Sequence, residues 1–400
     1  MKKMDIMSFY NGKRVLITGH TGFKGTWLTR ILLNAGALVT GYALKTLDDK
    51  NLYDISGVKN FRNFNSVIGD IRDLEYLRSV FNEVAPEIVF HLAAQPIVLE
   101  SYRNPVETYS TNVMGTVNIL ECVRLYQNTK YPVRSFLNIT TDKVYSNNEW
   151  YWGYREEDPL NGYDPYSNSK SCSELITSSY RQSFFNSNDK KNIDVSISTA
   201  RAGNVIGGGD FAANRIIPDC IRALEKAQDR GEREARIIVR NPASIRPYQH
   251  VLEPLMVYLD IAMAQYEDSK FGSCYNIGPD DFDCITTGKL VDLFCTSWNK
   301  RCACEEGELH LCRNDNEFLE EKAFIENRNE FYVPHEASFL KLDCSKLKSV
   351  FGWSARWHIE EGIDKTVEFY KVWLKCRKSG NYDQIALEMD REIDEFRSGK

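Results

Sequence analysis

The fold of this chain is decided by Val15-Leu16-Ile17-Thr18-Gly19-His20-Thr21-Gly22-Phe23-Lys24-Gly25. Its first four residues predict a short buried strand, and the residues after Gly25 continue with helical periodicity. Glycines between a strand and a helix allow a tight turn and a close approach of the backbone to a ligand. The helix N-terminus behind them offers N–H groups to a pyrophosphate. The stretch therefore predicts a dinucleotide site, with cofactor-binding residues Gly19, His20, Thr21, Gly22, Phe23, Lys24 and Gly25.

The first half of the chain alternates short apolar runs with amphipathic stretches. Apolar strands separated by helices imply a parallel sheet covered on both faces, which is the doubly wound (Rossmann) α/β arrangement. Ligands of such folds bind at the carboxyl ends of the strands. Strands are expected at Arg14–Thr18, Leu38–Tyr42, Asn65–Ile68, Ile88–His91, Ser135–Thr140 and Asp194–Thr199, and helices at Lys24–Ala35, Leu74–Val84, Val106–Tyr126 and Tyr166–Phe185.

After about residue 203 the pattern loosens, and Gly207-Gly208-Gly209 breaks it into shorter pieces. A smaller, discontinuous α/β domain for the substrate is expected here, while a helix at about Glu253–Gln265 and a strand at Tyr275–Ile277 return to the main sheet. The predicted dinucleotide domain comprises residues 1–203 and about 249–280, and the substrate domain comprises about 204–248 and 281–400. Residues 302–332 are polar and charged, which predicts a surface insertion.

Composition excludes several classes of protein. The formal net charge of −6 and the lack of a Lys/Arg-dense run argue against a nucleic-acid partner. No stretch of about 18 apolar residues predicts a membrane span, and no apolar segment follows the first residues as in a signal peptide. The eleven cysteines are scattered without disulfide spacing, which favours reduced thiols in a cytoplasmic enzyme. Four possible zinc ligands fit no common spacing, so no metal is expected at Cys302, Cys304, His310 and Cys312.

The identity of the dinucleotide is less clear from the sequence. The second strand ends in Tyr42-Ala43-Leu44-Lys45 and lacks the carboxylate that often holds the ribose of NAD, although Asp48 and Asp49 follow. Asp70 and Ile71 end the third strand, where an adenine would lie, and Asp70 is equally expected to cap the next helix. NAD is the preferred cofactor, and NADP stays open.

A second group of residues carries the expected chemistry. Tyr166 and Lys170 lie one helical turn apart, so both side chains leave the same face of a helix. A phenol normally titrates near about pH 10, and a neighbouring ammonium together with a nicotinium cation is expected to lower that pKa. The fifth strand ends in Thr141-Asp142-Lys143, which supplies a hydroxyl, an acid and a base. An elimination needs the acid and the base, whereas the alternative reading is an ion-paired strand end.

Together these motifs resemble the extended short-chain dehydrogenase/reductase family and, within it, the CDP-glucose 4,6-dehydratases. The resemblance runs from about residue 12 to 375. Beyond the glycine loop it rests on Trp152-Gly153-Tyr154-Arg155-Glu156, Gly162-Tyr163-Asp164-Pro165-Tyr166-Ser167-Asn168-Ser169-Lys170, Arg201-Ala202-Gly203-Asn204-Val205-Ile206-Gly207-Gly208-Gly209-Asp210, Arg246-Pro247-Tyr248-Gln249-His250-Val251-Leu252-Glu253-Pro254, Pro334-His335-Glu336-Ala337 and Leu340-Lys341-Leu342-Asp343.

This resemblance implies a mechanism in which a nucleotide sugar is oxidised, dehydrated and reduced on one enzyme. Tyr166, beside Lys170, would remove the 4-hydroxyl proton of the sugar, with Thr141 bonded to the 4-oxygen. Lys143 would take the carbon-5 proton, and Asp142 would protonate the departing 6-hydroxyl. The product would be CDP-4-keto-6-deoxyglucose. It further implies cofactor contacts at Ala93 and Ala94 and substrate contacts at Gln95, Asn204, Arg215, Arg246 and His335.

One further implication and two alternatives remain. Family members commonly form homodimers through the helices at Val106–Tyr126 and Tyr166–Phe185. A 4-epimerase, or a 4,6-dehydratase of a UDP, GDP or dTDP sugar, is the nearest alternative function. A binding module that senses NAD without chemistry is the alternative from another class, and such modules often lack the Tyr/Lys pair.

Overall fold

A parallel sheet of seven strands forms the centre of the structure, in the order β11-β6-β5-β4-β1-β2-β3. The computed structural model describes residues 5–46, 50–127, 129–185, 195–239, 241–302, 310–313 and 339–399. The strand order reverses between β1 and β4, so a crevice opens at their carboxyl ends. The predicted doubly wound fold is confirmed. Its strands are β1 (Arg14–Thr18), β2 (Leu38–Ala43), β3 (Phe64–Ile68), β4 (Ile88–His91), β5 (Ser135–Ile139), β6 (Ser196–Ala202) and β11 (Cys274–Ile277).

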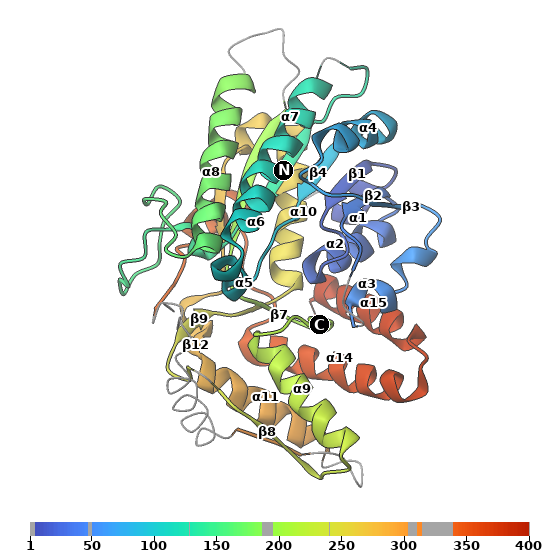
Figure 1. The fold of residues 1–400 in the computed structure, drawn as a ribbon, viewed down its shortest axis with the longest axis vertical. Helices are drawn as coiled ribbons and strands as arrows, with labels where there is room; N and C mark the ends of the chain where they lie inside the picture. Colours follow the sequence, from blue (N-terminus) through green and yellow to red (C-terminus); the bar gives the residue numbers. More distant parts are fainter. Residues whose placement is uncertain are drawn as a thin grey trace.

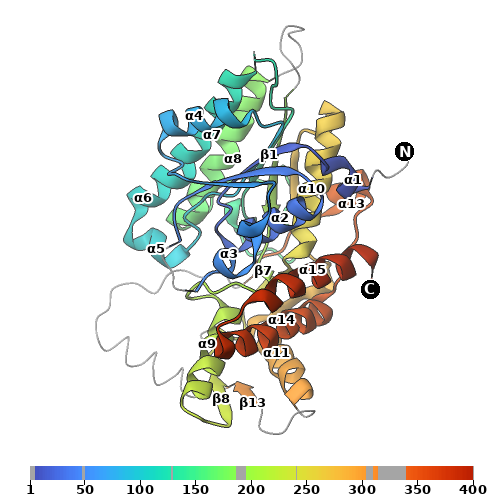
Figure 2. The same cartoon turned by 90° about the vertical axis from the view of Figure 1, so that its right-hand side faces the viewer.

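Helices cover both faces of this sheet (Figure 2). One face carries α1 (Ile6–Tyr10), α2 (Phe23–Asn34) and α10 (Leu252–Glu267). The other carries α4 (Leu74–Val84), α7 (Gly115–Tyr126) and α8 (Pro165–Phe184). The central strands β1, β4 and β5 are almost entirely buried, because helices cover both of their faces. Burial on both faces explains why their sequences are largely apolar and do not alternate with polar residues.

The predicted continuous helix at Val106–Tyr126 is wrong in one respect. A short helix α6 (Pro105–Tyr109) passes into a π-helical turn at Ser110–Met114, and only then does α7 begin. The wider turn carries Asn112 to the loop after β4, where its side chain accepts from the Gln95 N–H at 2.8 Å and donates to the Gln95 carbonyl at 3.1 Å. Apolar periodicity alone does not reveal such a turn, since the residues on either side keep a helical pattern.

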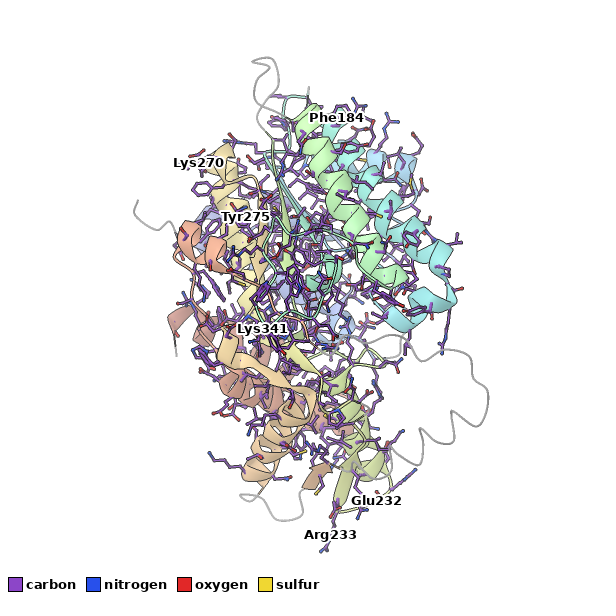
Figure 3. All side chains as sticks on the ribbon, turned by 90° about the vertical axis from the view of Figure 1, so that its left-hand side faces the viewer. Phe184, Glu232, Arg233, Lys270, Tyr275 and Lys341 are labelled. Carbon is purple, nitrogen blue, oxygen red and sulfur yellow. The ribbon has the colours of Figure 1, made fainter. Side chains whose placement is uncertain are left out.

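Below the sheet lies a second group of elements (Figure 1). In Figure 3, Phe184 and Arg233 lie toward opposite ends of the molecule, and Lys341 lies between its two parts. The group contains α9 (Ile216–Asp229), α11 (Thr287–Cys302), α14 (Ile359–Ser379) and α15 (Asp383–Ser398), with the strand pairs β7–β10 (Val205–Ile206, Gln249–His250), β9–β12 (Ile245–Pro247, Cys284–Thr286) and β8–β13 (Glu234–Ile237, His310–Arg313). Short elements complete the chain: α3 (Leu52–Ile55), η1 (Val58–Asn60), α5 (Val98–Arg103), η3 (Asp142–Val144), η4 (Ser269–Phe271), η5 (Asp281–Asp283) and α13 (Ser345–Phe351).

The division into two domains stays a prediction. The C-terminal helix α15, which the prediction assigns to the substrate domain, also packs on α2, where Arg30 Nη2 lies 2.5 Å from Asp390 Oδ2. Of the predicted insertion at 302–332, only β13 and the end of α11 are described. There Leu311 is buried, and its backbone N–H and carbonyl both bond the Asn299 side chain.

Two expected absences can be examined only within the described part of the chain. No helix in it combines the length and apolar character that a membrane crossing needs. No group of three or more His, Cys, Asp or Glu side chains in it is arranged to hold a metal ion. The Cys/His-rich segment that raised the question of zinc lies mostly outside the described residues.

A buried carboxyl joins α10 to the start of α14. Glu253 is 2% exposed, and its Oε1 accepts the backbone N–H groups of Arg356 and Trp357 at 2.7 and 2.8 Å. Its Oε2 is buried without a partner among the described residues. Burial dominates the two hydrogen bonds and raises the pKa of Glu253 to about 7.

We predict that Glu253→Gln stabilises the protein at alkaline pH. The folded state holds the Glu253 proton to about pH 7, whereas the unfolded carboxyl releases it near 4.5. The free energy of unfolding therefore falls as the pH rises through this window, by up to about 3 kcal/mol. Glutamine keeps both hydrogen bonds without the charge. Urea unfolding at pH 8.5 should show most of that gain, and the difference should vanish below pH 4.5. Exposed Glu267 on the same helix is the control, and an equal gain in Glu267→Gln would contradict the prediction.

Candidate active site

The glycine loop between β1 and α2 presses closely against the end of β4. Gly19 has φ +77°, and a Cβ there would lie 2.8 to 2.9 Å from backbone atoms of Leu92 and Ala93. A Cβ on Gly25 would lie 2.1 Å from the Gly19 carbonyl oxygen. Neither position can carry a side chain, because the loop backbone is packed against itself and against β4. The carboxyl end of β1 therefore lies at the bottom of the crevice where the strand order reverses.

This cradle fits the pyrophosphate of a dinucleotide. Gly22 is exposed and stands at the N-cap of α2 without a side-chain hydrogen bond, so the first N–H groups of the helix are available to a ligand. Thr21, Phe23 and Lys24 are all partly exposed, and Thr21 Oγ1 donates to the Leu44 carbonyl at 3.3 Å. The predicted cofactor residues of the loop, apart from His20, thus line or support one site.

His20 lies beneath the loop. Its ring is fully buried against Gly41 of β2, and its Nε2 lies 2.8 Å from Ser66 Oγ of β3. Burial lowers the pKa of His20 to about 4, so the ring is neutral at physiological pH. Its side chain supports the loop from below and does not face a ligand. Gly41 is the signal in the sequence for this packing, since any Cβ at that position would overlap the imidazole.

The end of β3 holds the residues expected near the adenine. Asp70 bonds the Arg72 guanidinium and backbone N–H, and this pairing lowers its pKa. Asp73, not Asp70, caps the following helix by accepting the Tyr76 N–H at 3.0 Å, so the predicted cap is corrected by three residues. Ile71 is buried beside Gly115. Asp48 and Asp49, the possible ribose ligands, lie outside the described residues.

The loop after β4 is organised by its own side chains. Ala93 N–H donates to Thr18 Oγ1 at 3.2 Å, which fastens β4 to β1 above the glycine loop. Gln95, predicted to bind the substrate, uses its amide within the protein: Nε2 donates to the Ile97 carbonyl and Thr108 Oγ1, and Oε1 accepts the Ile97 N–H at 2.6 Å. Its side chain shapes this loop, and Ala94 is partly exposed beside it.

Tyr166 and Lys170 lie on the first turns of α8, as predicted. Asp164 caps the helix by accepting the Ser167 N–H, and Pro165 occupies its first position. Lys170 is 3% exposed and donates from Nζ to the Ile139 carbonyl at 3.2 Å. Burial, together with the neighbouring charge of Lys24, lowers the pKa of Lys170 to about 7.

The phenol of Tyr166 differs from the expectation. Burial raises its pKa to about 12, although a hydrogen bond with Thr141 and the charge of Arg215 act in the opposite direction. The expected lowering depends on a bound nicotinium cation as well as on the Lys170 ammonium, and in the chain itself burial outweighs the groups that lower this pKa. The chain alone therefore keeps Tyr166 protonated.

Asp142 is the most unusual acid of the site. It is 1% exposed, its Oδ1 accepts from Thr141 Oγ1 at 3.0 Å, and its Oδ2 is buried without a partner among the described residues. Burial raises its pKa despite the nearby charges of Lys143, Arg246 and Lys24. Lys143 follows it in the 3₁₀ turn η3 and is partly exposed. An ion-paired surface strand end would not bury the acid in this way.

Cations from three parts of the chain converge on this edge. Lys24 of the glycine loop has its pKa lowered to about 8 by burial and by Arg215, against the opposing charge of Asp142. Arg215, before α9, pairs with Asp210 at 2.9 Å and lies close enough to Tyr166 to affect its pKa. Arg246 of β9 is 4% exposed and acts on Asp142. Arg215 and Arg246, both predicted to bind the substrate, therefore lie near the catalytic residues Tyr166 and Asp142.

No hydrogen bond or ion pair within the described part of the chain joins the other two predicted substrate residues, Asn204 and His335, to the catalytic residues. Asn204 follows β6 and is partly exposed, and its carbonyl accepts the Gln249 N–H at 3.0 Å. His335 lies outside the described residues. The sequence reasoning missed Glu174, which lies one turn beyond Lys170 on the same face of α8, and its buried partner Arg201. The spacing of four residues from Lys170 was the available signal.

Comparisons with known proteins agree with this geometry. The family model described as GDP-mannose 4,6 dehydratase matches residues 16–366. A protein named CDP-glucose 4,6-dehydratase from Salmonella typhimurium is 46% identical over 392 residues, covering 98% of each chain. A crystal structure of dTDP-glucose 4,6-dehydratase from Bacillus anthracis in complex with NAD superposes with a TM-score of 0.66 at 20% identity, covering 90% of this chain and 97% of that one. A UDP-glucose 4-epimerase complex with NAD from Thermus thermophilus gives 0.66 at 22% identity, covering 90% and 99%.

The fold and the site thus define a nucleotide-sugar-modifying enzyme class of the short-chain dehydrogenase/reductase type. The chain belongs to the GDP-mannose 4,6-dehydratase family. The resemblance drawn from the motifs is confirmed at this level.

We predict that Gly19→Ala weakens NAD binding by about tenfold or more. The new methyl group would strain a left-handed backbone, at about 1–2 kcal/mol, and would displace the loop from Ala93. Gly12→Ala is the matched control, because Gly12 also has a positive φ, +73°, but lies before β1, at the end of that strand away from the loop, and a Cβ there would meet nothing within 4 Å. Isothermal titration of both variants with NAD checks this, and similar affinities for the two would refute it.

Proposed function

We propose that the protein is a hydro-lyase that converts CDP-glucose to CDP-4-keto-6-deoxyglucose and water, with NAD as its cofactor. The observation that carries this proposal is the buried acid Asp142 beside Lys143, within reach of the Tyr166 and Lys170 pair. An enzyme that only oxidises or epimerises a sugar alcohol needs the Tyr/Lys pair alone. The 46% identity to a CDP-glucose 4,6-dehydratase supports the choice of nucleotide and sugar.

The residues that would hold NAD are those of the glycine loop, with Asp70 and Ile71 toward the adenine and Ala93 and Ala94 along β4. Bound there, NAD would supply the acceptor, and later the donor, of the hydride that leaves and re-enters the sugar, and its positive charge would favour the phenolate of Tyr166. The preference over NADP is supported by the NAD complexes of the Bacillus anthracis and Thermus thermophilus enzymes, and by the commitment of Arg72 to Asp70.

Tyr166 and its neighbours serve the oxidation. Tyr166 removes the proton of the sugar 4-hydroxyl, and Thr141 hydrogen-bonds the same oxygen. Both groups are buried, so water does not compete for them. Lys170 lies one turn along α8 with a pKa near 7, and its protonated form stabilises the phenolate. The proton removed from the hydroxyl is thus held by the protein.

Asp142 and Lys143 serve the elimination. Oxidation at carbon 4 makes the carbon-5 proton acidic, and Lys143 takes it as the general base. Asp142 then protonates the departing 6-hydroxyl. A carboxyl whose pKa is raised by burial keeps its proton to higher pH, as a proton donor requires. The 4-epimerase alternative leaves this buried acid without a function, and the sensing-module alternative leaves the Tyr/Lys pair without one.

The substrate pyrophosphate needs cationic partners, and Arg215 and Arg246 are proposed to supply them, since Arg215 lies close enough to Tyr166, and Arg246 to Asp142, to affect the pKa of each. Asn204 and His335 remain proposed substrate contacts, and Gln95 is proposed to act through the loop that it shapes. These assignments rest on the positions of the residues and on the resemblance of their motifs.

A homodimer and a cytoplasmic location belong to the same proposal. Large apolar side chains are exposed along the helices of the outer face, where a partner would cover them: Val106 at 82%, Leu175 at 56%, Met114 at 50% and Phe184 at 45%. The nine described cysteines form no disulfide, which a reducing compartment favours.

We predict that the purified protein converts CDP-glucose to a 4-keto-6-deoxy sugar nucleotide without an added reductant. Rates with UDP-, GDP- and dTDP-glucose should be lower by about a hundredfold or more, because a site built for one base rejects analogues that leave its polar groups unpaired. Chromatography of the products, with mass spectrometry for the loss of water, checks this. Faster turnover of another nucleotide sugar would replace the proposed substrate, and a product of unchanged mass would indicate an epimerase.

We predict that Lys143→Met abolishes exchange of the carbon-5 proton with solvent, lowering its rate by about a thousandfold, as expected for loss of a general base. Tyr166→Phe should prevent both oxidation and exchange. CDP-glucose deuterated at carbon 5 and followed by mass spectrometry measures the exchange. Exposed Lys226 on α9 offers a control, since Lys226→Met removes a lysine far from the site. Normal exchange in Lys143→Met would remove that residue from the mechanism.

A further inference from the structure

Beneath the catalytic residues lies a buried carboxylate that takes no part in the proposed chemistry. Glu174 is 3% exposed and lies on α8, one turn beyond Lys170. Its Oε1 accepts from Thr140 Oγ1 at 2.5 Å, and its Oε2 accepts from Thr199 Oγ1 at 2.7 Å and from Arg201 Nη2 at 2.9 Å. A buried charge is costly unless it is paired and hydrogen-bonded, and both oxygens here have partners.

The position of Thr140 gives this arrangement its significance. Thr140 directly precedes the segment Thr141–Tyr145, which carries the predicted hydroxyl, acid and base. Lys170 Nζ donates to the carbonyl of the residue before it, Ile139, at 3.2 Å. Successive turns of α8 therefore hold successive residues of the chain that leads into the catalytic segment.

The other end of the segment is held by the partner of Glu174. Arg201 is 3% exposed, and its Nη1 donates to the Tyr145 hydroxyl and to the Glu156 carbonyl, each at 2.8 Å. The Tyr145 hydroxyl in turn donates to Asn276 Oδ1 at 2.6 Å, on β11. Between the two ends, Ser171 Oγ of α8 donates to the Val144 carbonyl at 2.7 Å.

We propose that the Glu174–Arg201 ion pair is a positioning device for the reaction, which holds both ends of the segment Thr141–Tyr145 at a set distance from Tyr166 and Lys170. Glu174 holds the first end through Thr140, and Arg201 holds the second through Tyr145. Tyr166 acts at carbon 4, whereas Asp142 and Lys143 act at carbons 6 and 5 of the same ring. Their two chain segments must therefore keep one separation throughout each turnover. This inference rests on the proposed function for its catalytic consequence, and on the hydrogen bonds for its structural one.

Neither residue of the pair can touch the sugar, since both are buried beneath the segment that carries the reacting groups. Their loss should lower kcat and leave KM for the nucleotide sugar nearly unchanged, because the pyrophosphate contacts come from other parts of the chain. A displacement of about 1 Å in reacting groups is sufficient to cost about a hundredfold in rate. If the pair only stabilised the fold, its loss would instead lower the unfolding temperature with no specific effect on kcat.

The test removes one hydroxyl at each end of the segment. Thr140→Val keeps the shape of the side chain and deletes the bond to Glu174. Tyr145→Phe likewise deletes the bond to Arg201, together with the bond from the same hydroxyl to Asn276. Each should lower kcat for CDP-glucose by about tenfold or more, with KM changed by less than about twofold. Glu174→Leu removes both acceptor oxygens and should lower kcat further, and in the double variant Glu174→Leu, Thr140→Val the two effects should not multiply, because both changes delete the hydrogen bond between residues 140 and 174.

Thr177→Val is the matched control. Thr177 lies one turn beyond Glu174 on α8, is buried, and accepts from Asn138 Nδ2 of β5 at 2.9 Å. It thus joins the same helix to the same strand but does not hold the catalytic segment. Its removal should lower the unfolding temperature about as much as Thr140→Val and leave kcat within about twofold of the unmodified protein.

A second measurement is independent of turnover. Amide hydrogen exchange of the protein without cofactor or substrate should be faster over residues 141–145 in Thr140→Val and Tyr145→Phe, and unchanged there in Thr177→Val. Unaltered exchange in the first two variants, or a loss of kcat no larger than in Thr177→Val, would overturn the proposal. Failure of the unmodified protein to turn over CDP-glucose would refute the proposed function instead, while the exchange comparison would still decide whether the ion pair holds the segment.

Discussion

The active site depends on the burial of ionisable groups at the carboxyl edge of one parallel sheet. Asp142, Tyr166 and Lys170 are each less than 10% exposed, and burial is the largest influence on the pKa of all three. Burial favours the neutral form of every group. It therefore raises the pKa values of the Asp142 carboxyl and the Tyr166 phenol, which keep their protons, and lowers the pKa of the Lys170 amine, which loses its proton more easily. The chain thereby places a proton donor and a proton acceptor within one water-poor crevice, as successive proton transfers at one sugar ring require.

The same constraint explains why the site is assembled from segments that lie far apart in the sequence. A buried charge needs partners, and the glycine loop, the end of β5, α8 and β9 each contribute one or two. Lys24 acts on both Lys170 and Asp142, and Arg215 acts on both Lys24 and Tyr166, so the pKa values of the group are linked. The charge of each of these residues therefore influences the pKa of its neighbours in the site.

The sequence predicted those parts of the molecule that local pattern determines. The strand–loop–helix at Gly19–Gly25 and the Tyr166/Lys170 pair were recognisable because their function requires particular residue types at particular spacing. His20 and Gln95 were misjudged as to how their side chains are used, since both look like ligand residues in the motif. Only tertiary contacts show that one ring fills the space above Gly41 and that one amide folds its own loop. The sequence also did not show how strongly burial raises the pKa of Tyr166 in the chain itself, because that burial is a property of the whole fold.

Burial on this scale also limits how the reacting groups can be held. An exposed side chain can be oriented by solvent and by small motions, but a buried one keeps the position that its backbone gives it. The distance between the β5 segment and α8 must therefore be set by groups that are themselves buried and hydrogen-bonded. Glu174 meets that condition, because both of its oxygens accept hydrogen bonds, from Thr140, Thr199 and Arg201. A lone carboxylate in the same place would be destabilising. The cost of burying the pair is thus offset by the hydrogen bond between its two members and by four further hydrogen bonds, to Thr140, Thr199, Tyr145 and the Glu156 carbonyl. Thr140 and Tyr145 lie at the two ends of the catalytic segment, which explains why this ion pair lies beneath the site and not at the surface.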